Sequence, residues 1–175
     1  RQRAHVAANQ RLDLRGGAPM SEKQFSTFYL DDALFGIDIL VIREINRHLD
    51  MTKVHQVAEH VRGLLNLRGQ IITMLDLGVK LGLEPRSITP ESRGIILKTH
   101  DEILAQGIGH MVNEQTGTDQ VGLLVDRVGD VVSVKETEID SPPANIGEIN
   151  GKYFSGVVKL DGELLSILKI SEIIS

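Results

Sequence analysis

Six histidines are the residues of this sequence that most readily suggest metal chemistry. His55 and His60 stand five positions apart, and His100 and His110 stand ten apart. Neither spacing, taken with the nearby acidic residues, forms the two-histidine, one-carboxylate pattern of a facial metal triad. The chain contains no cysteine, which removes thiolate nucleophiles, disulfides and cysteine-based zinc sites together. The sequence therefore predicts no metal site.

Catalytic motifs are also missing from the sequence. Neither the Gly-x-Ser-x-Gly elbow, nor a Walker loop, nor a complete dinucleotide fingerprint occurs. Residues 106–110 contain Gly-x-Gly, but the final glycine of the fingerprint is absent. The adjacent carboxylates Asp31 and Asp32 lie in a predicted turn, where we expect them to face water. No nucleophile, base and oxyanion site can be assembled. We predict a protein that is not an enzyme and needs no cofactor.

The turn Leu67-Arg68-Gly69 is the most distinctive feature that could bind a partner. An X-Gly pair between apolar strands predicts a tight hairpin, because glycine adopts the positive φ that such turns require. A turn position exposes the guanidinium of Arg68, whose planar fork of donors suits carboxylates. The alternative is that Arg68 is merely a solvated turn residue.

Strands must position this turn, and the composition favours them. Aromatic residues make up 3% of the chain, so isoleucine, leucine and valine must fill the core. These side chains suit pleated, half-buried surfaces. Residues 39–45 could be a strand or a short helical turn, and so could residues 170–174. Residues 99–120 are polar and rich in glycine, which predicts a long mobile loop. The predicted strands are residues 25–30, 35–39, 71–75, 94–97, 121–125, 131–134, 156–160 and 163–168.

An internal repeat relates the two halves of the chain. Residues 60–77 can be laid over residues 153–170 at an offset of 93 positions, which matches Gly63 to Gly156 and Gly69 to Gly162. A second match, at an offset of 86, lays residues 35–45 over 121–131. The turn Asp161-Gly162 then corresponds to the Arg68 turn, so we expect the same hairpin geometry with a different charge. We expect Gly63, Gly69, Gly156 and Gly162 to serve backbone geometry.

Two copies of a five-strand unit predict a mainly β fold. Small sheets close most easily as barrels, which hide their edges. The fold class is therefore two tandem five-stranded SH3-like β-barrels with short helical turns. The groove between two such barrels is a natural place for a partner segment.

The charge is unevenly distributed along the chain. The net charge is −5, but residues 1–20 hold four arginines against one aspartate, a local charge of +3, which leaves −8 for the remainder. An acidic body disfavours binding to nucleic acid. No apolar run approaches the ~20 residues that span a bilayer, so we expect no direct membrane insertion. Residues 1–20 are interpreted as a flexible leader or an upstream extension, and residues 21–175 as the folded domain.

Residues 25–174 resemble the bacterial chemotaxis coupling proteins, the CheW family. The resemblance rests on an ordered series of motifs, each weak when taken singly. They are residues 35–39 (FGIDI), 42–45 (IREI), 62–72 (RGLLNLRGQII), 76–77 (DL), 121–126 (VGLLVD) and 164–168 (LLSIL). One departure is that residues 99–120 are longer than the family's short hairpin.

The resemblance implies a single CheW-like domain made of two interleaved β-barrel subdomains. It implies a non-catalytic, cytoplasmic adaptor, recruited to membrane receptor arrays through its partners. Those partners are the cytoplasmic tips of methyl-accepting chemotaxis receptors and the regulatory domain of a CheA-type histidine kinase. Carried over from the family, Glu44 is the acidic neighbour of Arg68. Ile42, Leu65 and Leu67 would line an apolar partner groove, although packing in the core is the alternative for each.

Two other functions remain open from the sequence. The chain could be a CheW-like regulatory domain excised from a larger signalling protein, such as the kinase or a coupling protein fused to a receiver domain. It could also be a scaffold in a pathway other than chemotaxis, such as motility by pili.

Overall fold

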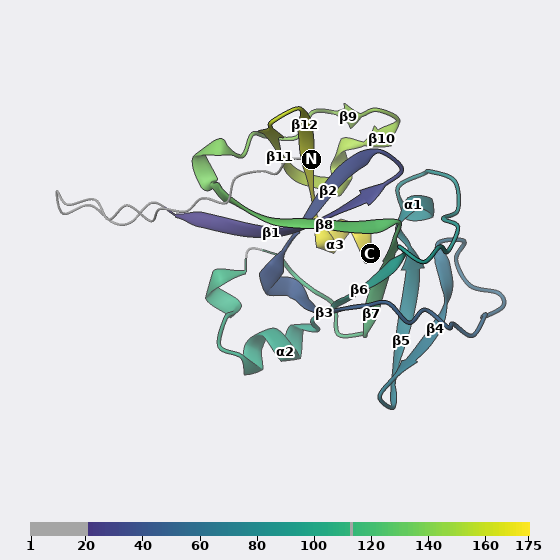
Figure 1. The fold of residues 1–175 in the computed structure, drawn as a ribbon. Coiled ribbons are helices and arrows are strands. Elements are labelled where there is room, and N and C mark those ends of the chain that lie inside the picture. The colour runs from purple at the N-terminus through teal and green to yellow at the C-terminus, as the bar shows by residue number, and fades with distance from the viewer. Residues whose placement is uncertain (1–20, 113) are drawn as a thin grey trace.

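The computed structural model describes residues 21–112 and 114–175. The predicted leader, residues 1–20, lies outside the described residues. The described chain is mainly β, as predicted, and forms two five-stranded sheets (Figure 1). Its strands are β1 (Glu22–Leu30), β2 (Ala33–Asp38), β3 (Ile42–Asn46), β4 (Val61–Leu67), β5 (Gln70–Asp76), β6 (Arg93–Leu97), β7 (Val121–Val125), β8 (Arg127–Lys135), β9 (Asn145–Ile146), β10 (Ile149–Asn150), β11 (Phe154–Leu160) and β12 (Glu163–Leu168).

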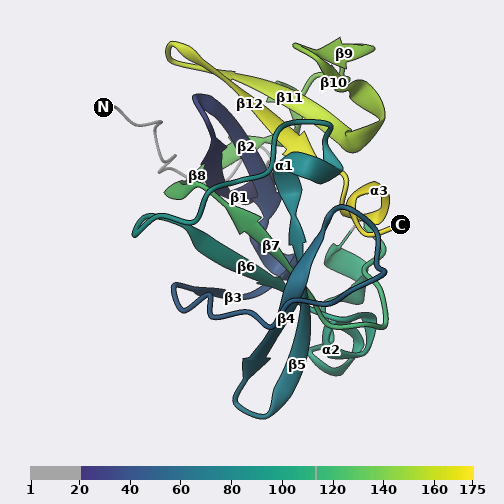
Figure 2. The same cartoon turned by 90° about the vertical axis from the view of Figure 1, so that its right-hand side faces the viewer.

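The chain shares its strands between the two sheets. Sheet A has the order β11-β12-β2-β1-β8, and sheet B has the order β3-β6-β7-β5-β4. The chain begins in sheet A, makes the whole of sheet B, and returns to sheet A with β8, β11 and β12. The hairpins β4–β5 and β11–β12 consequently project from opposite ends of the molecule (Figures 1 and 2).

The repeat seen in the sequence is present as a repeated strand register. In sheet B, β5 pairs in parallel with β7 so that Thr73 lies opposite Val121. In sheet A, β12 pairs in parallel with β2 so that Ser166 lies opposite Phe35. Ser166 is 93 positions after Thr73, and Val121 is 86 positions after Phe35. The parallel pairing of β5 with β7 in sheet B therefore corresponds to the pairing of β12 with β2 in sheet A. The two sequence offsets relate the two strands of one pair to the two strands of the other.

A pair of backbone hydrogen bonds closes each sheet toward a barrel. After β3 the chain reaches Thr52, which exchanges two bonds of 2.8 Å with Leu64 of β4. After β8 it reaches Asp140, which exchanges two bonds of 2.9 Å with Val157 of β11. Leu64 and Val157 correspond at the offset of 93. The same closure is thus built twice.

Gly63 and Gly156 stand immediately before these closing residues, where the backbones come close. A Cβ on Gly63 would lie 2.7 Å from the Thr52 carbonyl oxygen. A Cβ on Gly156 would lie 2.5 Å from the Ile139 side chain and 3.0 Å from the Asp140 carbonyl oxygen. Close approach is therefore the reason for these two glycines. Gly69 and Gly162 instead sit in hairpin turns with φ values of 84° and 74°.

Three apolar clusters hold the fold together. One is formed by residues of the strands of sheet A and includes Val158, Leu165 and Ile167. A second is formed by residues of the strands of sheet B, namely Leu65, Ile72, Met74 and Ile96. The members Leu65, Ile72 and Met74 are the offset-93 counterparts of the three residues named for sheet A. The largest cluster joins the sheets, with Phe28 and Phe35 from sheet A and Ile95 and Leu123 from sheet B. Burial of this shared core makes the two sheets depend on each other.

Short helices occupy the connections. Residues 39–45 were predicted to be either a strand or a short helical turn, and they contain both: the 3₁₀ turn η1 (Ile39–Val41) is followed by β3. The end of the chain forms α3 (Ile170–Ile173), whose Ile170 and Ile173 are fully buried in the shared core. Helix α3 lies between the two sheets, near α1 (Leu77–Lys80) (Figures 1 and 2). Within the described ranges, no helix is long and apolar enough to cross a membrane.

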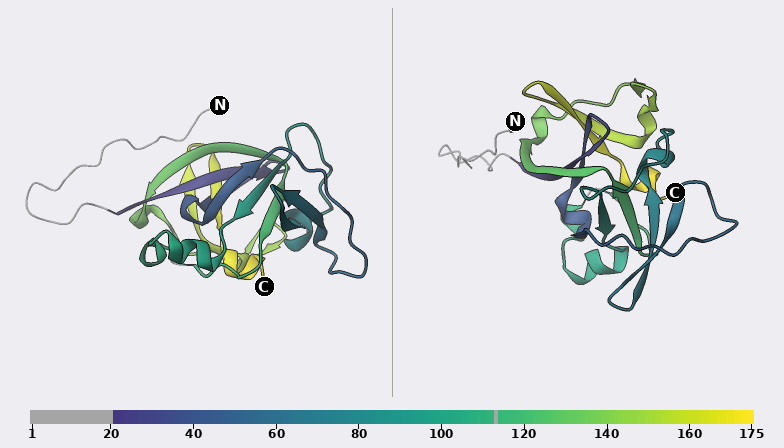
Figure 3. Two further views of the ribbon diagram at one scale, coloured as in Figure 1. Left: turned by 90° about the horizontal axis from the view of Figure 1, so that it is seen from below. Right: turned by 45° about the vertical axis from the view of Figure 1, so that its right-hand side comes forward.

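The prediction of a loop throughout residues 99–120 was wrong. The segment contains α2 (His100–Ala105) and the 3₁₀ turn η2 (Gly109–Met111). Thr99 accepts a hydrogen bond from the Glu102 amide, and the Glu102 carboxylate accepts one from the Thr99 amide, which makes a capping box. Thr-x-x-Glu was visible in the sequence as a helix start. Helix α2 lies beside β3 at the end of sheet B (Figures 1 and 3).

Candidate partner-binding site

The hairpin β4–β5 presents Arg68 in a tight, well-defined turn. Arg68 and Gly69 have φ values of 51° and 84°, so both central residues are left-handed, as a type I′ turn requires. The Gly69 amide also donates a 3.0 Å hydrogen bond to the Asn66 side chain. In the counterpart turn only Gly162 is left-handed, and Asp161 is not. The expectation of one shared hairpin geometry was therefore wrong: the first central residue is left-handed in the Arg68 turn but not in the Asp161 turn.

Arg68 forms an ion pair with Glu44 of β3, across from the hairpin. The Arg68 side chain is 69% exposed, whereas the Glu44 side chain is 27% exposed. An exposed ion pair of this kind contributes little to the stability of a fold. Its charges are nevertheless held in a defined place at the surface, where a partner carboxylate or cation can engage them.

The three apolar residues assigned to the site have different positions. Leu65 is 4% exposed and packs inside sheet B, so its side chain belongs to the core. Leu67 and Ile42 are partly buried and pack against core clusters. Residues alternate between the faces of a strand, so the inward position of Leu65 follows from its pairing with buried Ile72. Ile71, the neighbour of Ile72, is exposed instead.

Arg43 is a functional candidate that the sequence reasoning missed. Its guanidinium holds the Glu102 carboxylate of α2 with two hydrogen bonds, of 2.9 and 2.5 Å. It also donates to the side chains of Gln70 and Gln120, at 3.3 and 3.1 Å. The Arg43 hydrogen bonds lower the pKa of Glu102 and keep it ionised. The neighbouring pair Arg43-Glu44 was visible in the sequence within the motif at residues 42–45, but only Glu44 was assigned to the site.

The second copy of the repeat carries a different charge pattern. Asp130 corresponds to Glu44 and Asp161 corresponds to Arg68, so two acids replace an acid and a base. Asp130 and Asp161 line one pocket, together with Arg127, whose guanidinium lies 3.7 Å from the centre of the Tyr29 ring. The two sheets therefore present surfaces of different charge, and only sheet B has the Arg68–Glu44 pair.

Comparison with known proteins shows the family. The model of the CheW-like domain matches residues 24–175. The chain belongs to the CheW family. The chemotaxis protein CheW of Treponema pallidum is 30% identical over 158 residues, which cover 89% of this chain and 85% of that protein. The CheW protein of Thermotoga maritima is 30% identical over 155 residues, with 89% of each chain covered.

The CheW fold is also shared with a solved structure. The scaffolding protein TtCheW of Thermoanaerobacter tengcongensis superposes with a TM-score of 0.72 at 27% identity, covering 89% of each chain. This likeness confirms the expected pair of SH3-like units. In the described parts of the chain, no group of three or more histidine or acidic side chains is arranged to hold a metal ion.

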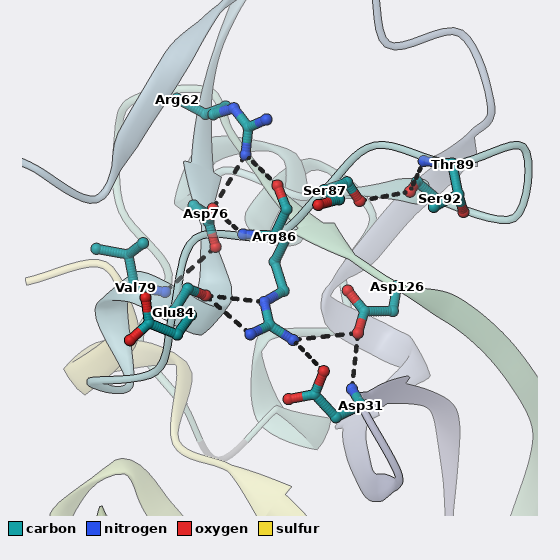
Figure 4. A network of polar contacts seen from close by, with 10 residues as sticks. All are labelled: Asp31, Arg62, Asp76, Val79, Glu84, Arg86, Ser87, Thr89, Ser92 and Asp126. Carbon is teal, nitrogen blue, oxygen red and sulfur yellow. Dashed lines mark hydrogen bonds and ion pairs between the residues drawn. The ribbon is translucent and has the colours of Figure 1, made fainter.

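A polar network at the junction of the two sheets was not foreseen (Figure 4). Arg86 lies in the connection between α1 and β6, and its side chain is only 6% exposed. Its guanidinium pairs with Asp126 at 3.1 Å and with Asp31 at 3.0 Å, and it donates twice to the Glu84 carbonyl oxygen. Asp31 comes from the β1–β2 turn of sheet A. Asp31 and Asp32 are exposed in a turn, as expected, and Asp31 in addition pairs with Arg86.

Asp76 links the same connection to sheet B. Its carboxylate accepts the Arg86 amide at 2.8 Å and pairs with Arg62 at 3.1 Å. It also accepts the Val79 amide at 3.2 Å and so caps α1. Gly78 makes room for this arrangement, because a Cβ there would lie 2.5 Å from the Arg86 side chain. The motif Asp76-Leu77 thus has a structural explanation within the CheW fold.

Glu114 is the one described carboxyl group whose pKa is raised to about 7. Burial is the main cause, and the charge of Asp38 adds to it, while Lys23 and Lys169 act in the opposite direction. Glu136 also lines the cavity that holds Glu114. The Glu114 carboxyl group accepts a 2.5 Å hydrogen bond from the Ile170 amide at the start of α3.

The raised pKa predicts a pH dependence of stability. The folded state binds the Glu114 proton more tightly than the unfolded chain, whose carboxyl has an ordinary pKa of 4.5. The stabilisation that comes from binding this proton is therefore fully present below pH 4.5 and is lost as the pH rises through about 7. Glu114→Gln still accepts the hydrogen bond from the Ile170 amide but does not titrate. As the pH is raised from 5 to 8, we expect its free energy of unfolding to rise by about 2 kcal/mol relative to that of the parent protein. Urea unfolding of both proteins at several pH values checks this, and a constant difference would contradict it.

Proposed function

We propose that this chain is a non-catalytic adaptor that couples the cytoplasmic tips of chemoreceptors to a CheA-type histidine kinase. It acts in the cytoplasm and reaches membrane receptor arrays through these partners. The observation that carries the proposal is the Arg68–Glu44 pair, which a rigid hairpin and the facing strand hold at the surface. The relatives described above, which are named as chemotaxis proteins, support the pathway. They match along most of their own length.

The surface fits a kinase regulatory domain better than nucleic acid or a small molecule. Arg68 and Glu44 offer one charge of each sign, which a complementary ion pair on another protein can engage. Exposed Ile45 follows Glu44, and exposed Ile71 follows Gln70, so apolar area is available close to the charged residues in sequence. Leu67 and Ile42 remain members of the proposed contact surface, while Leu65 supports the hairpin from inside. Charges at such an edge set the rate and specificity of association.

Charge reversal tests the proposed interface. We expect Arg68→Glu and Glu44→Arg each to weaken binding to the regulatory domain of the kinase at least tenfold, which is about 1.4 kcal/mol. The melting temperature should change little, because an exposed pair contributes about 0–1 kcal/mol to stability. Isothermal titration calorimetry measures the affinity, and Lys159→Glu, an exposed reversal on β11, serves as the control.

The design separates contact with the partner from damage to the fold. The double variant carrying both reversals restores the internal ion pair and its surface position, but it presents the charges exchanged. If the single variants and the double variant all bound the kinase domain as the parent protein does, the assignment of this surface would be wrong. If the parent protein bound neither kinase nor receptor fragments, the proposed function itself would be wrong.

A further inference from the structure

Arg43 occupies a β-bulge directly before Glu44. In the pairing of β3 with β6, Ile42 lies opposite Leu97 and Glu44 lies opposite Ile96, so Arg43 is the extra residue on β3. A bulged residue has no place in the ladder, and it re-aims the side chains next to it. The direction of Glu44 therefore depends on what holds Arg43 in place.

The side chain of Arg43 is held from three directions. Glu102 of α2 takes two of its donors, and the Gln70 and Gln120 side chains take one each. Gln70 is the first residue of β5, immediately after the Arg68-Gly69 turn. Arg43 thus touches both halves of the proposed site: it adjoins Glu44 in β3 and contacts Gln70, the residue that follows the turn presenting Arg68.

The segment that supplies Glu102 is itself fixed to the body of the molecule. The His100 amide donates a 2.9 Å hydrogen bond to the Gly117 carbonyl oxygen, which draws the two ends of the segment together. Ile103 is buried in the shared core, and Glu114 binds the first amide of α3. The capping box then sets the rotamer of Glu102. A carboxylate held in this way is a firm anchor for a guanidinium.

The second copy of the repeat has the bulge without the arginine. The pairing of β1 with β8 shifts register between Ser26 and Phe28, and Gly129 stands at the position equivalent to Arg43. A Cβ on Gly129 would lie 2.6 Å from the Thr27 hydroxyl oxygen, so this bulge has no room for a side chain. Among the described residues, the bulge in β3 is tied to a helix through Arg43 and Glu102, and the equivalent bulge in β8 has no side chain that could make such a contact.

We propose that the segment 99–120 positions the partner-binding surface through the Glu102–Arg43 contact. Glu102 and Arg43 are positioning residues: they set the direction of Glu44 and the approach of the Arg68 hairpin, without touching the partner. The inference rests on the proposed function for its partner, which is the regulatory domain of the kinase. It assigns to this segment a role in tuning affinity for that partner.

Glu102→Gln is the variant that isolates the contact in the full chain. Glutamine at this helix position keeps the capping box, so α2 is retained. Its amide oxygen can accept only part of the paired donation from Arg43, and the carboxylate charge is lost. We expect affinity for the kinase regulatory domain to fall three- to tenfold. Asp101→Asn, which removes the same charge from an exposed position on the same turn, should stay within twofold of the parent protein.

The same substitution in a background that carries both Arg68→Ala and Glu44→Ala distinguishes positioning from direct contact. If Glu102 acts through the Arg68–Glu44 pair, its effect on affinity disappears when both residues are removed. An undiminished effect in that background would show that α2 contacts the partner directly, and it would overturn the inference. Equal affinities of Glu102→Gln and the parent protein would overturn it as well.

A measurement without the partner keeps this inference separable from the proposed function. Nuclear magnetic resonance of the arginine Nε–H groups should show the Arg68 signal moving in Glu102→Gln but not in Asp101→Asn. An unchanged Arg68 signal would count against positioning, even if the parent protein bound no kinase. Absence of kinase binding together with a shifted signal would reject the proposed function and leave the mechanical link intact.

Discussion

Replacing Arg86 with methionine is expected to lower the free energy of unfolding by about 3 kcal/mol, because it leaves charged and polar partners without a donor. The Asp126 carboxylate and the Glu84 carbonyl oxygen would lose their contacts at the junction of the two sheets. The Asp31 turn of sheet A would lose its link to the α1–β6 connection. Methionine keeps the length and apolar stem of the side chain, so the loss reports on the guanidinium. Urea unfolding measures it.

A matched arginine at the start of β6 provides the control. Arg93 donates to the Pro90 and Ser92 carbonyl oxygens but pairs with no carboxylate among the described residues. We expect Arg93→Met to cost less than about 1 kcal/mol, the ordinary value for such hydrogen bonds. Equal losses in the two variants would show that the junction network contributes nothing beyond local hydrogen bonding. Adding Asp126→Asn to Arg86→Met should recover part of the loss, because it removes the unpaired charge.

Gly63→Ala is expected to destabilise the protein by about 2–3 kcal/mol, through overpacking at the closure of sheet B. The added methyl group would meet the Thr52 carbonyl oxygen at 2.7 Å, and a backbone oxygen can move only if the closing hydrogen bonds with Leu64 are disturbed. Gly156→Ala should cost somewhat less, because its nearest obstacle is the Cγ2 methyl group of Ile139, while the backbone oxygen of Asp140 lies farther away, at 3.0 Å. Urea unfolding ranks the two variants, and amide exchange at Leu64 locates the damage.

Gly109→Ala is the control for a glycine that has room. Its nearest neighbour would be the Leu104 side chain at 3.6 Å, an ordinary contact distance, and its φ is not left-handed. We expect no loss of stability there. If Gly63→Ala were as stable as Gly109→Ala, closure of sheet B would not require the close approach of Thr52. Faster exchange of the Leu64 amide in Gly63→Ala alone is the expected signature.

Much of the fold could be predicted from the sequence, because its signals are local or repeated. Alternation of apolar residues marks strands, and the X-Gly pairs at Gly69 and Gly162 mark hairpins. The two offsets then imply two equivalent sheets, and the structure has them in equivalent register. Helix α2 was missed although its signal was local, because the polar composition of residues 99–120 outweighed the capping box that begins at Thr99.

The candidate site was only partly accessible to the same reasoning. Arg68 could be singled out because a turn exposes its side chain and its counterpart Asp161 has the opposite charge. The inward position of Leu65 was left open, because an apolar residue in a strand beside an exposed turn fits either face until the register is known. The register with Ile72 decided that question.

The sequence by itself determined the strands, their duplication and the family, because each depends on residue types along a short stretch or on a comparison of two stretches. Only the tertiary structure showed which distant residues meet. Arg43 reaches Glu102 across 59 positions, and Arg86 reaches Asp126 across 40. Such pairs have no periodicity or turn chemistry to reveal them, since they arise only when sheets, bulge and helix are assembled. The Arg68 turn is therefore local in origin, but the surface it belongs to is created by the packing of the whole domain.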